Sequence, residues 1–139
     1  MTDISQKNAD LARKFYTLLG QKKLEEWIEL WHEDGKILIP YPPEDFASTI
    51  EGKDTIHEAF EGLLGNFETF ESTITGVYSD INSDAVCVEY TNHAVLVGGT
   101  VYTNTNIAVF RFKNGLISEY HDYFDPRRFQ VVVDALAQK

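Results

Sequence analysis

The 139-residue sequence has a single cysteine and few basic residues. Cys87 cannot form an internal disulfide, and there is no second thiol to share a metal with it, so a reducing, cytoplasmic setting is expected. The chain carries 12 Lys and Arg against 22 Asp and Glu, and its basic residues form no adjacent group longer than a pair such as Lys22-Lys23 or Arg127-Arg128. Because phosphate-binding surfaces need clustered cations, we expect neither nucleic acid nor an anionic membrane as a partner.

The sequence also lacks long apolar runs. No stretch approaches the roughly 20 apolar residues of a membrane span, and the first ten residues, MTDISQKNAD, contain no basic segment followed by an apolar one. We therefore expect no span and no secretory signal. An apolar fraction of 43% and an aromatic fraction of 13% are typical of a folded protein, and the length predicts one domain over residues 1–139.

The first half of the chain has the apolar spacing of helices. Asp3 and Gln6 resemble a capping box, and apolar residues then recur at helical spacing up to Gly20. Trp27 and Trp31 share one stripe of a second helix, which favours a place in the core over a cofactor platform. The predicted elements are helices over 3–20, 24–32 and 53–64, a short strand over 36–40, and a proline-bearing loop over 40–48 that is long enough to form a rim or lid.

The second half has the period-two pattern of strands, which are predicted over 67–79, 84–97, 100–113 and 116–124. Turn residues separate them at Asn82-Ser83, Gly98-Gly99 and Asn114-Gly115, so successive strands should pair as an antiparallel meander. Asp125-Pro126 reads as an N-cap and first turn of a last helix over 126–137. Helices followed by strands predict an α+β architecture with helices on one face of a curved sheet.

The turns also predict which side chains share a face of this sheet. With two residues in each turn, Ile107 opposes both Tyr90 and Asp122. The mostly apolar face, expected under the helices, then carries Val86, Val88, Tyr90, Asn92, Thr103, Thr105, Ile107, Val109, Tyr120, Asp122 and Phe124. The polar face, expected to meet solvent or a second subunit, carries Glu89, Thr91, His93, Asn104, Asn106, Glu119 and His121. A homodimer through this outer face and a hydrated monomer both fit its composition.

Three segments resemble the nuclear transport factor 2-like superfamily, and in particular its SnoaL-like and phenazine-biosynthesis A/B branches. They are LWHEDGKILIP, IEGKDTIHEAF and YTNTNIAVFRFKNGLISEYHDYFDP. The resemblance covers nearly the whole chain and implies a cone-shaped barrel, with a curved antiparallel sheet wrapped around three N-terminal helices and a short C-terminal helix. It also implies a homodimer. Because this scaffold hosts enzymes, binding modules and assembly domains, it predicts the fold more strongly than the function.

The resemblance further implies which reactions to expect. Steroid isomerases use a tyrosine and two aspartates where this chain has Phe15, Ile39 and Ile107, and epoxide hydrolases use an Arg-x-Asp pair where it has Thr105 and Ile107. Neither reaction is therefore expected. Asp122 matches the acid/base carboxylate of the SnoaL-like cyclases, and His57 is the nearest match to a histidine of the phenazine branch.

Asp122 is the residue on which the functional predictions depend. A carboxylate in an apolar pocket has a raised pKa and can exchange protons near neutral pH, although Asp122 could instead be a structural partner of Tyr90, Tyr120 or a loop amide. One hypothesis is a cofactor-independent enzyme for an apolar carbonyl compound, with Asp122, His57 and Tyr120 as catalytic residues. The other is a non-catalytic binding protein for a small apolar or aromatic ligand. Under either hypothesis, the predicted pocket residues are Phe15, Trp27, Trp31, Ile39, Tyr90, Ile107 and Phe124. No cofactor is expected, and no spacing of His, Cys and carboxylates suggests a metal.

Overall fold

The computed structural model describes residues 3–137, so the ends of the expected domain, residues 1–2 and 138–139, lie outside the described part. The helices are α1 (Asp3–Gly20), α2 (Leu24–Ile28), α3 (Lys53–Leu64) and α4 (Pro126–Ala137). The strands are β1 (Trp31–Leu38), β2 (Thr49–Glu51), β3 (Phe67–Ser79), β4 (Val86–Leu96), β5 (Val101–Lys113) and β6 (Leu116–Phe124). The predicted α+β class is confirmed, and among the described helices none is long and apolar enough to cross a membrane.

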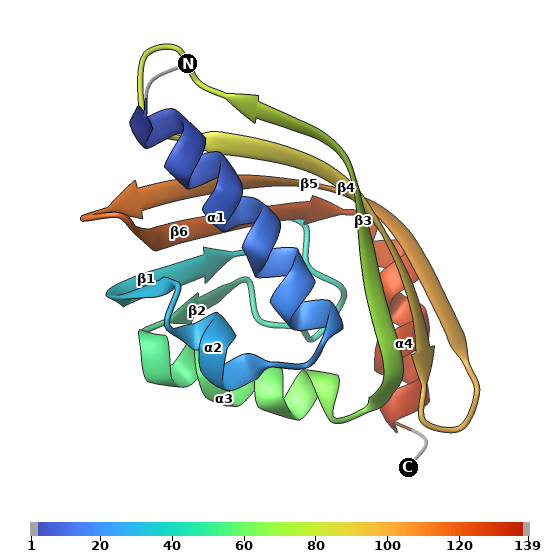
Figure 1. Ribbon diagram of the computed structural model, residues 1–139. Helices are drawn as coiled ribbons and strands as arrows, with labels where there is room; N and C mark the ends of the chain where they lie inside the picture. Colours follow the sequence, from blue (N-terminus) through green and yellow to red (C-terminus); the bar gives the residue numbers. More distant parts are fainter. Residues whose placement is uncertain (1–2, 138–139) are drawn as a thin grey trace.

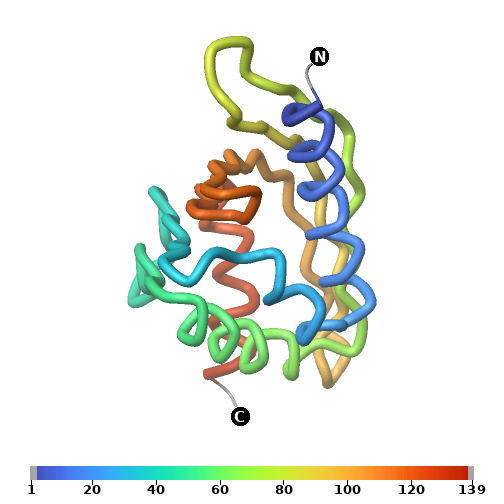
Figure 2. The backbone as a smooth tube through the Cα atoms, turned by 60° about the vertical axis from the view of Figure 1, so that its left-hand side comes forward, coloured from blue at the N-terminus to red at the C-terminus, as the bar shows by residue number. Residues whose placement is uncertain are grey.

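The strands form one curved, open sheet in the order β2-β1-β6-β5-β4-β3 (Figure 1). Neighbouring strands are antiparallel except β1 and β6, which pair in parallel. Helix α1 lies across the concave face, and α2 and α3 follow it at one end of the sheet, as the turned view in Figure 2 also shows. Helix α4 packs against β5. The curvature leaves a cavity between the sheet and the helices.

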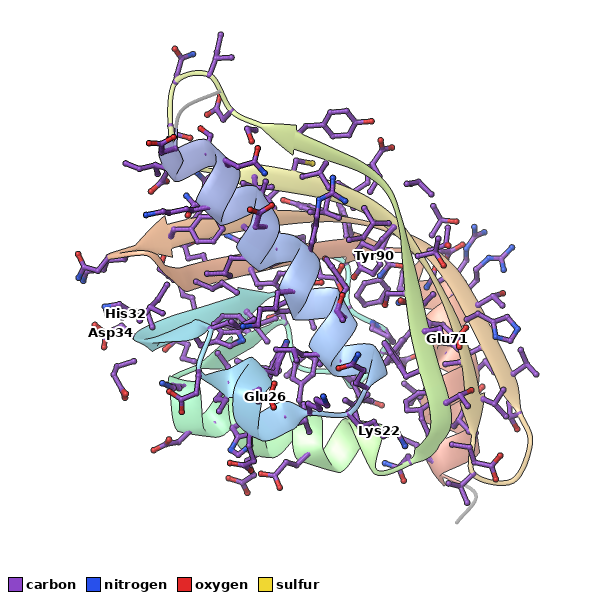
Figure 3. All side chains as sticks on the ribbon, in the orientation of Figure 1. Lys22, Glu26, His32, Asp34, Glu71 and Tyr90 are labelled. Carbon is purple, nitrogen blue, oxygen red and sulfur yellow. The ribbon has the colours of Figure 1, made fainter. Side chains whose placement is uncertain are left out.

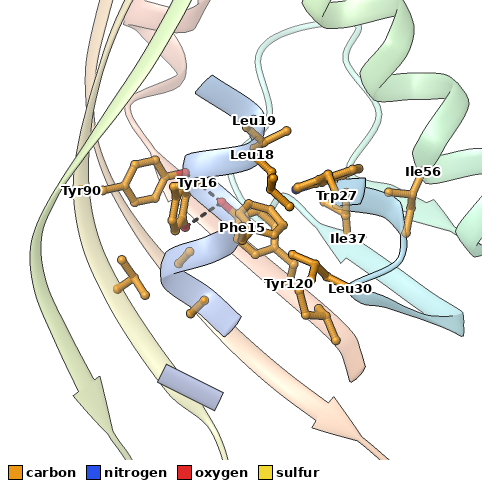
Figure 4. Close-up of a cluster of buried hydrophobic side chains, with 14 of the residues drawn as sticks. Phe15, Tyr16, Leu18, Leu19, Trp27, Leu30, Ile37, Ile56, Tyr90 and Tyr120 are labelled. Atoms are coloured by element: carbon orange, nitrogen blue, oxygen red, sulfur yellow. Dashed lines mark hydrogen bonds between the residues drawn. The ribbon is translucent and has the colours of Figure 1, made fainter. Parts of the chain in front are cut away.

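An aromatic cluster forms the centre of the core (Figure 4). The ring of Phe15 on α1 lies 4.7 Å from that of Tyr120 and 5.3 Å from that of Trp27, measured between centroids. Phe15, Trp27 and Trp31 are fully buried. Burial of such large rings is worth several kcal/mol at about 25 cal/mol per Å², so this cluster fixes α1 and α2 against the sheet.

The region of the second helix differs from its prediction. Helix α2 ends at Ile28, and Trp31, expected on the helix, begins strand β1. The backbone carbonyl of Leu30 accepts a hydrogen bond from the amide of Ile117, and Trp31 pairs with Ile117 of β6. Pairing with a strand 86 positions along the chain thus overrides the local helical spacing. The short edge strand β2 was not predicted.

The turns confirm one register prediction and overturn another. Asn114 and Gly115 have φ of 55° and 78°, as a two-residue type I′ hairpin requires. The β4–β5 turn instead places three residues, Val97 to Gly99, between Leu96 and Thr100. The prediction that Ile107 opposes Tyr90 and Asp122 is therefore wrong, because Tyr90 pairs with Asn106 and Asp122 pairs with Ala108.

The extra turn residue reverses the two faces of β5. Asn104 and Asn106, expected outside, are 4% and 3% exposed on the inner face, whereas Ile107, expected inside, is 42% exposed. A bulge between β5 and β6, at the step from Arg111 to Phe112, adds a second one-residue shift. The two shifts cancel for β6, so Asp122 still shares the inner face with Tyr90.

Candidate functional site

A cavity of about 320 Å³ lies between the concave face of the sheet and the helices, at the lower end of the size expected for a small-molecule site. Its lining is mainly apolar. The lining side chains come from all three long helices, from the proline-bearing loop and from the six strands: Phe15, Tyr16, Leu19, Ile37, Ile39, Phe46, Ile50, Ala59, Phe60, Gly62, Leu63, Asn66, Phe70, Ser72, Tyr90, Asn92, Tyr102, Asn106, Tyr120, Asp122, Phe124, Phe129 and Leu136.

Polar groups are distributed unevenly around this cavity. Strands β3 to β6 contribute Ser72, Tyr90, Asn92, Tyr102, Asn106, Tyr120 and Asp122. Helices α3 and α4 contribute apolar side chains and Gly62, and Phe46 of the proline-bearing loop packs edge-on against Phe129 of α4, 5.3 Å between ring centroids. A ligand would therefore meet hydrogen-bonding groups on the sheet side and hydrocarbon on the side of α3 and α4.

Asp122 is the single charged residue among the described residues that line the cavity. Its Oδ1 accepts a hydrogen bond of 2.8 Å from the hydroxyl of Tyr90 and a longer one of 3.4 Å from Nδ2 of Asn106. Burial raises the pKa of Asp122 to about 7, and the hydrogen bonds from Tyr90 and Asn106 oppose that rise. The residue keeps partial exposure, which is consistent with its place on the cavity wall. Both protonation states of Asp122 are thus populated near neutral pH.

Three tyrosine hydroxyls form a chain that ends at Asp122. Tyr16 on α1 lies 3.0 Å from Tyr120 on β6, and Tyr120 lies 2.9 Å from Tyr90 on β4, oxygen to oxygen. Figure 4 shows these three rings, and Figure 3 places Tyr90 between the sheet and α1. Burial raises the pKa of each tyrosine well above its usual value, so all three remain protonated.

The number of hydrogens on each group fixes the direction of the hydrogen bonds in this series of hydroxyls. Each hydroxyl has one hydrogen to donate, and a carboxylate can only accept. When Asp122 is charged, Tyr90 donates to it, so Tyr120 must donate to Tyr90, and Tyr16 to Tyr120. All three hydroxyl dipoles then stabilise the negative charge on Asp122. A protonated Asp122 can donate as well as accept, so the direction of these hydrogen bonds is then no longer fixed.

A second cluster of hydrogen-bonded polar side chains lies beside the contacts of Asp122 on the inner face of the sheet. Ser72 donates its hydroxyl hydrogen to Oδ1 of Asn92 at 2.6 Å, and Asn104 donates from Nδ2 to the hydroxyl oxygen of Tyr102 at 2.8 Å. Asn104 also donates to the carbonyl of Asp125 at 3.0 Å and accepts from its amide at 3.3 Å. Asn104 therefore ties the N-terminal end of α4 to β5, where the Asp125 side chain caps the helix by accepting from the amide of Arg127.

The structure brings together six of the ten residues predicted for the site. Those six line the cavity: Phe15, Ile39, Tyr90, Tyr120, Asp122 and Phe124. Trp27 and Trp31 do not, because both are fully buried in the aromatic core behind Phe15. Ile107 is on the outer face, because the extra residue in the β4–β5 turn reverses the two faces of β5.

His57 also lies away from the cavity. Its ring nitrogens are 3.3 Å from Glu25 and 3.5 Å from Glu61, carboxylates that are largely exposed on α2 and α3. Helical spacing explains this position, because Ile56 and Phe60 take the inward face of α3. His57 and Asp122 are therefore not assembled into one constellation.

The most important residue that the sequence reasoning missed is Asn106, which contacts both Tyr90 and Asp122. A usable signal was present, because Ala108, Phe110 and Phe112 form an apolar alternation that places Asn106 on the same face when it is extended backwards. Within residues 3–137 no group of three or more His, Cys, Asp or Glu side chains is arranged to hold a metal ion.

Comparison with known proteins identifies the family and the fold of this chain. The model of the SnoaL-like domain family matches residues 12–120. Protein YesE of Bacillus subtilis (strain 168), itself uncharacterised, is 30% identical over 122 residues, which is 87% of this chain and 83% of YesE. A crystal structure from Bacillus subtilis with a provisional isomerase designation has a TM-score of 0.83 and 28% identity, over 99% of this chain and 98% of its own. The phenazine biosynthesis-related protein phzb2 of Pseudomonas aeruginosa has a TM-score of 0.81 and 21% identity, covering 96% and 86%.

Proposed function

Because this chain belongs to the SnoaL-like domain family, as its sequence resemblance predicted, we propose that it is a cofactor-independent enzyme that moves a proton at the carbon next to the carbonyl of an apolar ring compound. The observation that carries the proposal is the position of Asp122. It is the sole charged group described in an otherwise uncharged cavity, and its pKa of about 7 allows it to take up and release a proton near neutral pH.

In the proposed reaction the Asp122 carboxylate removes a proton from the α-carbon of the ligand. The electrons of the broken C–H bond form a C=C bond, and the carbonyl π electrons move to oxygen, which gives an enolate and a neutral Asp122. Tyr90 is then no longer held by a carboxylate, so its hydroxyl can donate to the enolate oxygen. Return of the proton to a different carbon would complete an isomerisation, and attack of the enolate carbon on a second carbonyl would close a ring.

The other two residues expected to be catalytic receive different roles. Tyr120 donates to Tyr90 and acts through it, so we assign it a positioning role. His57 is paired with Glu25 and Glu61 outside the cavity, and no proton-transfer step is assigned to it.

Exchange of hydrogen for deuterium tests this proposal without knowledge of the natural substrate. 2-Tetralone is an apolar bicyclic ketone with acidic α-hydrogens, and their replacement in D₂O is followed by NMR. The wild-type protein should accelerate exchange above the buffer rate, and Asp122→Asn should not. Equal rates with wild-type protein, with Asp122→Asn and with buffer alone would contradict the enzymatic proposal.

The alternative is a binding protein that holds an apolar or aromatic ligand without chemistry. The observation that favours it is the pairing of Asp122, which already accepts hydrogen bonds from Tyr90 and Asn106. Under this alternative, 2-tetralone should bind in calorimetry without any exchange of its α-hydrogens.

We also propose a homodimer formed through the outer face of the sheet. The observed register places Ile107 and Val109 on this face, between the polar residues Glu89 and His121. Light scattering at low micromolar concentration should give twice the 15.8 kDa of the chain. A cytoplasmic location remains part of the proposal, and fractionation of cells that express the tagged protein would test it.

A further inference from the structure

Tyr102 of β5 has a hydroxyl hydrogen that no described residue accepts. Its oxygen accepts from Nδ2 of Asn104 at 2.8 Å, and the nearby side chain of Asn92 lowers the pKa of Tyr102, as a hydrogen-bond donor does. The donor on Asn92 is Nδ2, because the amide nitrogen is the one group of an asparagine side chain that can donate. Both neighbours of the oxygen are thus donors, and the hydroxyl must direct its own hydrogen elsewhere.

The surroundings of Tyr102 leave the cavity as the place where this hydrogen can find an acceptor. The residue is 2% exposed, and it lines the cavity. Buried donors without an acceptor are rare, so the partner of this hydrogen must come from the cavity, as water or as an oxygen of a ligand. Asn92 and Asn104, which hold the oxygen, are themselves buried at 7% and 4% exposure. The oxygen is therefore held in one place with its hydrogen free.

The register gives the spacing between Tyr102 and the reacting carboxylate. Asp122 is held by Tyr90 and Asn106, which pair across β4 and β5. The hydroxyl of Tyr102 is held by Asn92 and Asn104, which form the next inward pair along the same two strands. Inward pairs are two residues apart, or about 7 Å at the rise of a strand. That separation is about the width of one or two fused rings.

We propose that Tyr102 is a second anchor in the cavity, and that its hydroxyl donates a hydrogen bond to a second oxygen of the ligand. This inference rests on the proposed function and narrows its substrate class. The ligand is an apolar ring compound with two oxygen functions on opposite sides. One is the carbonyl beside Asp122, and the other is a carbonyl, ether or hydroxyl oxygen that accepts from Tyr102. The apolar residues of α3 and α4 cover the face of the rings.

Two matched probes test the anchor by binding alone. 6-Methoxy-2-tetralone offers an acceptor oxygen on the ring opposite its ketone, and 6-methyl-2-tetralone has a similar shape without that oxygen. Calorimetry with the wild-type protein should show a preference of about 3- to 10-fold for the methoxy probe, as expected from one added hydrogen bond. Tyr102→Phe should bind both probes equally, with the affinity for the methyl probe retained.

Tyr78→Phe is the matched control, because its lost hydroxyl is bonded to Glu89 and lies outside the cavity. It should keep the preference for the methoxy probe. Near-UV circular dichroism checks that Tyr102→Phe, which retains the ring packed 5.5 Å from Phe129, is folded. The anchor is overturned if the folded Tyr102→Phe protein keeps the preference, or if wild-type protein shows none or binds neither probe.

The outcome is independent of catalysis. A preference that depends on Tyr102 in a protein that exchanges no α-hydrogens would support the anchor and refute the proposed enzyme. Exchange that depends on Asp122, without any role for Tyr102 in binding, would support the proposed enzyme and refute the anchor.

Discussion

The hydroxyl of Tyr90 lies 2.8 Å from Oδ1 of Asp122, although the residues are 32 positions apart and on strands separated by β5. The contact crosses β5 on the inner face of the sheet, where Asn106 pairs with Tyr90 and Ala108 pairs with Asp122. Ala108 leaves room above β5, and Asn106 donates to both partners. A carboxylate, an amide and the last of three linked hydroxyls thus meet at one wall of an apolar cavity.

Replacement of the carboxylate should separate catalysis from folding. Asp122→Asn keeps the size of the side chain but cannot take up a proton, so we expect exchange of the 2-tetralone α-hydrogens to fall by about 10²- to 10⁴-fold, the usual contribution of a general base. Glu119→Gln is the control, because Glu119 lies on the same strand but outside the cavity, where it pairs with His121. A similar loss in both variants would argue against a specific role for Asp122.

Asp122 should also make stability depend on pH. Its pKa is about 7 in the folded protein and near 3.9 when unfolded, so between these values the folded state holds a proton that the unfolded state has released. This contribution is complete below about pH 4 and is lost as the pH rises to about 7, on the order of 2–4 kcal/mol. Urea unfolding at pH 4.5 and pH 8 should show Asp122→Asn gaining stability relative to wild type at the higher pH.

A second carboxylate supplies a control of opposite sign. The hydrogen bond with His121 lowers the pKa of Glu119, so its contribution is present at neutral pH and lost on acidification. Relative to wild type, Glu119→Gln should therefore gain stability at the lower pH. If the two variants responded to pH in the same direction, the assignment for Asp122 would be wrong.

Loss of the Tyr90 hydroxyl should raise the pKa of Asp122 further. Tyr90→Phe removes the shorter of the two hydrogen bonds that stabilise the carboxylate, while burial still favours the neutral acid. The pH–rate profile of α-hydrogen exchange should rise through about pH 7 in wild type and through a higher pH in Tyr90→Phe. Tyr78→Phe removes a hydroxyl bonded to Glu89 outside the cavity and should leave the profile unchanged.

The buried amide of Asn104 should be structural. Asn104→Ala removes the bonds to both backbone groups of Asp125 and the donor to Tyr102, so we expect a loss of about 2 kcal/mol in the free energy of unfolding. Denaturant unfolding measures this loss. Asn82→Ala, in the exposed β3–β4 turn, is the control and should change stability by no more than about 0.5 kcal/mol.

A charge at the centre of the outer face should dissociate the proposed dimer. Ile107 is 42% exposed in the chain, and Ile107→Glu would place a carboxylate in the interface near Glu89, its partner across β4 and β5. Light scattering should then give the mass of one chain. Ile81→Glu, at a residue that is 93% exposed in the β3–β4 turn, should leave the dimer intact. A wild-type protein with the mass of a single chain would refute the dimer directly.

Local chemistry determined most of the elements. The positive φ of Asn114 and Gly115, the cap of α4 at Asp125 and the inward stripe of α3 each depend on residues a few positions apart, and each was predicted from the sequence. The inward position of Asp122 was also predicted. Its partner on β5 is Ala108 and not the predicted Ile107, but Asp122 still faces inward because two one-residue shifts cancel.

Tertiary structure decided the composition of the site. One extra residue in the turn at Gly98-Gly99 reverses β5, which brings Asn106 to Asp122 and sends Ile107 outside, because successive residues of a strand point to opposite faces. The parallel pairing of β1 with β6 likewise took Trp31 from the expected helix. The sequence alone thus determined the fold class and the inward position of Asp122. The partners of Asp122 depended on the pairing of strands that are distant in the sequence. The stability of such pairings comes from tertiary packing, which the local spacing of residues does not reveal.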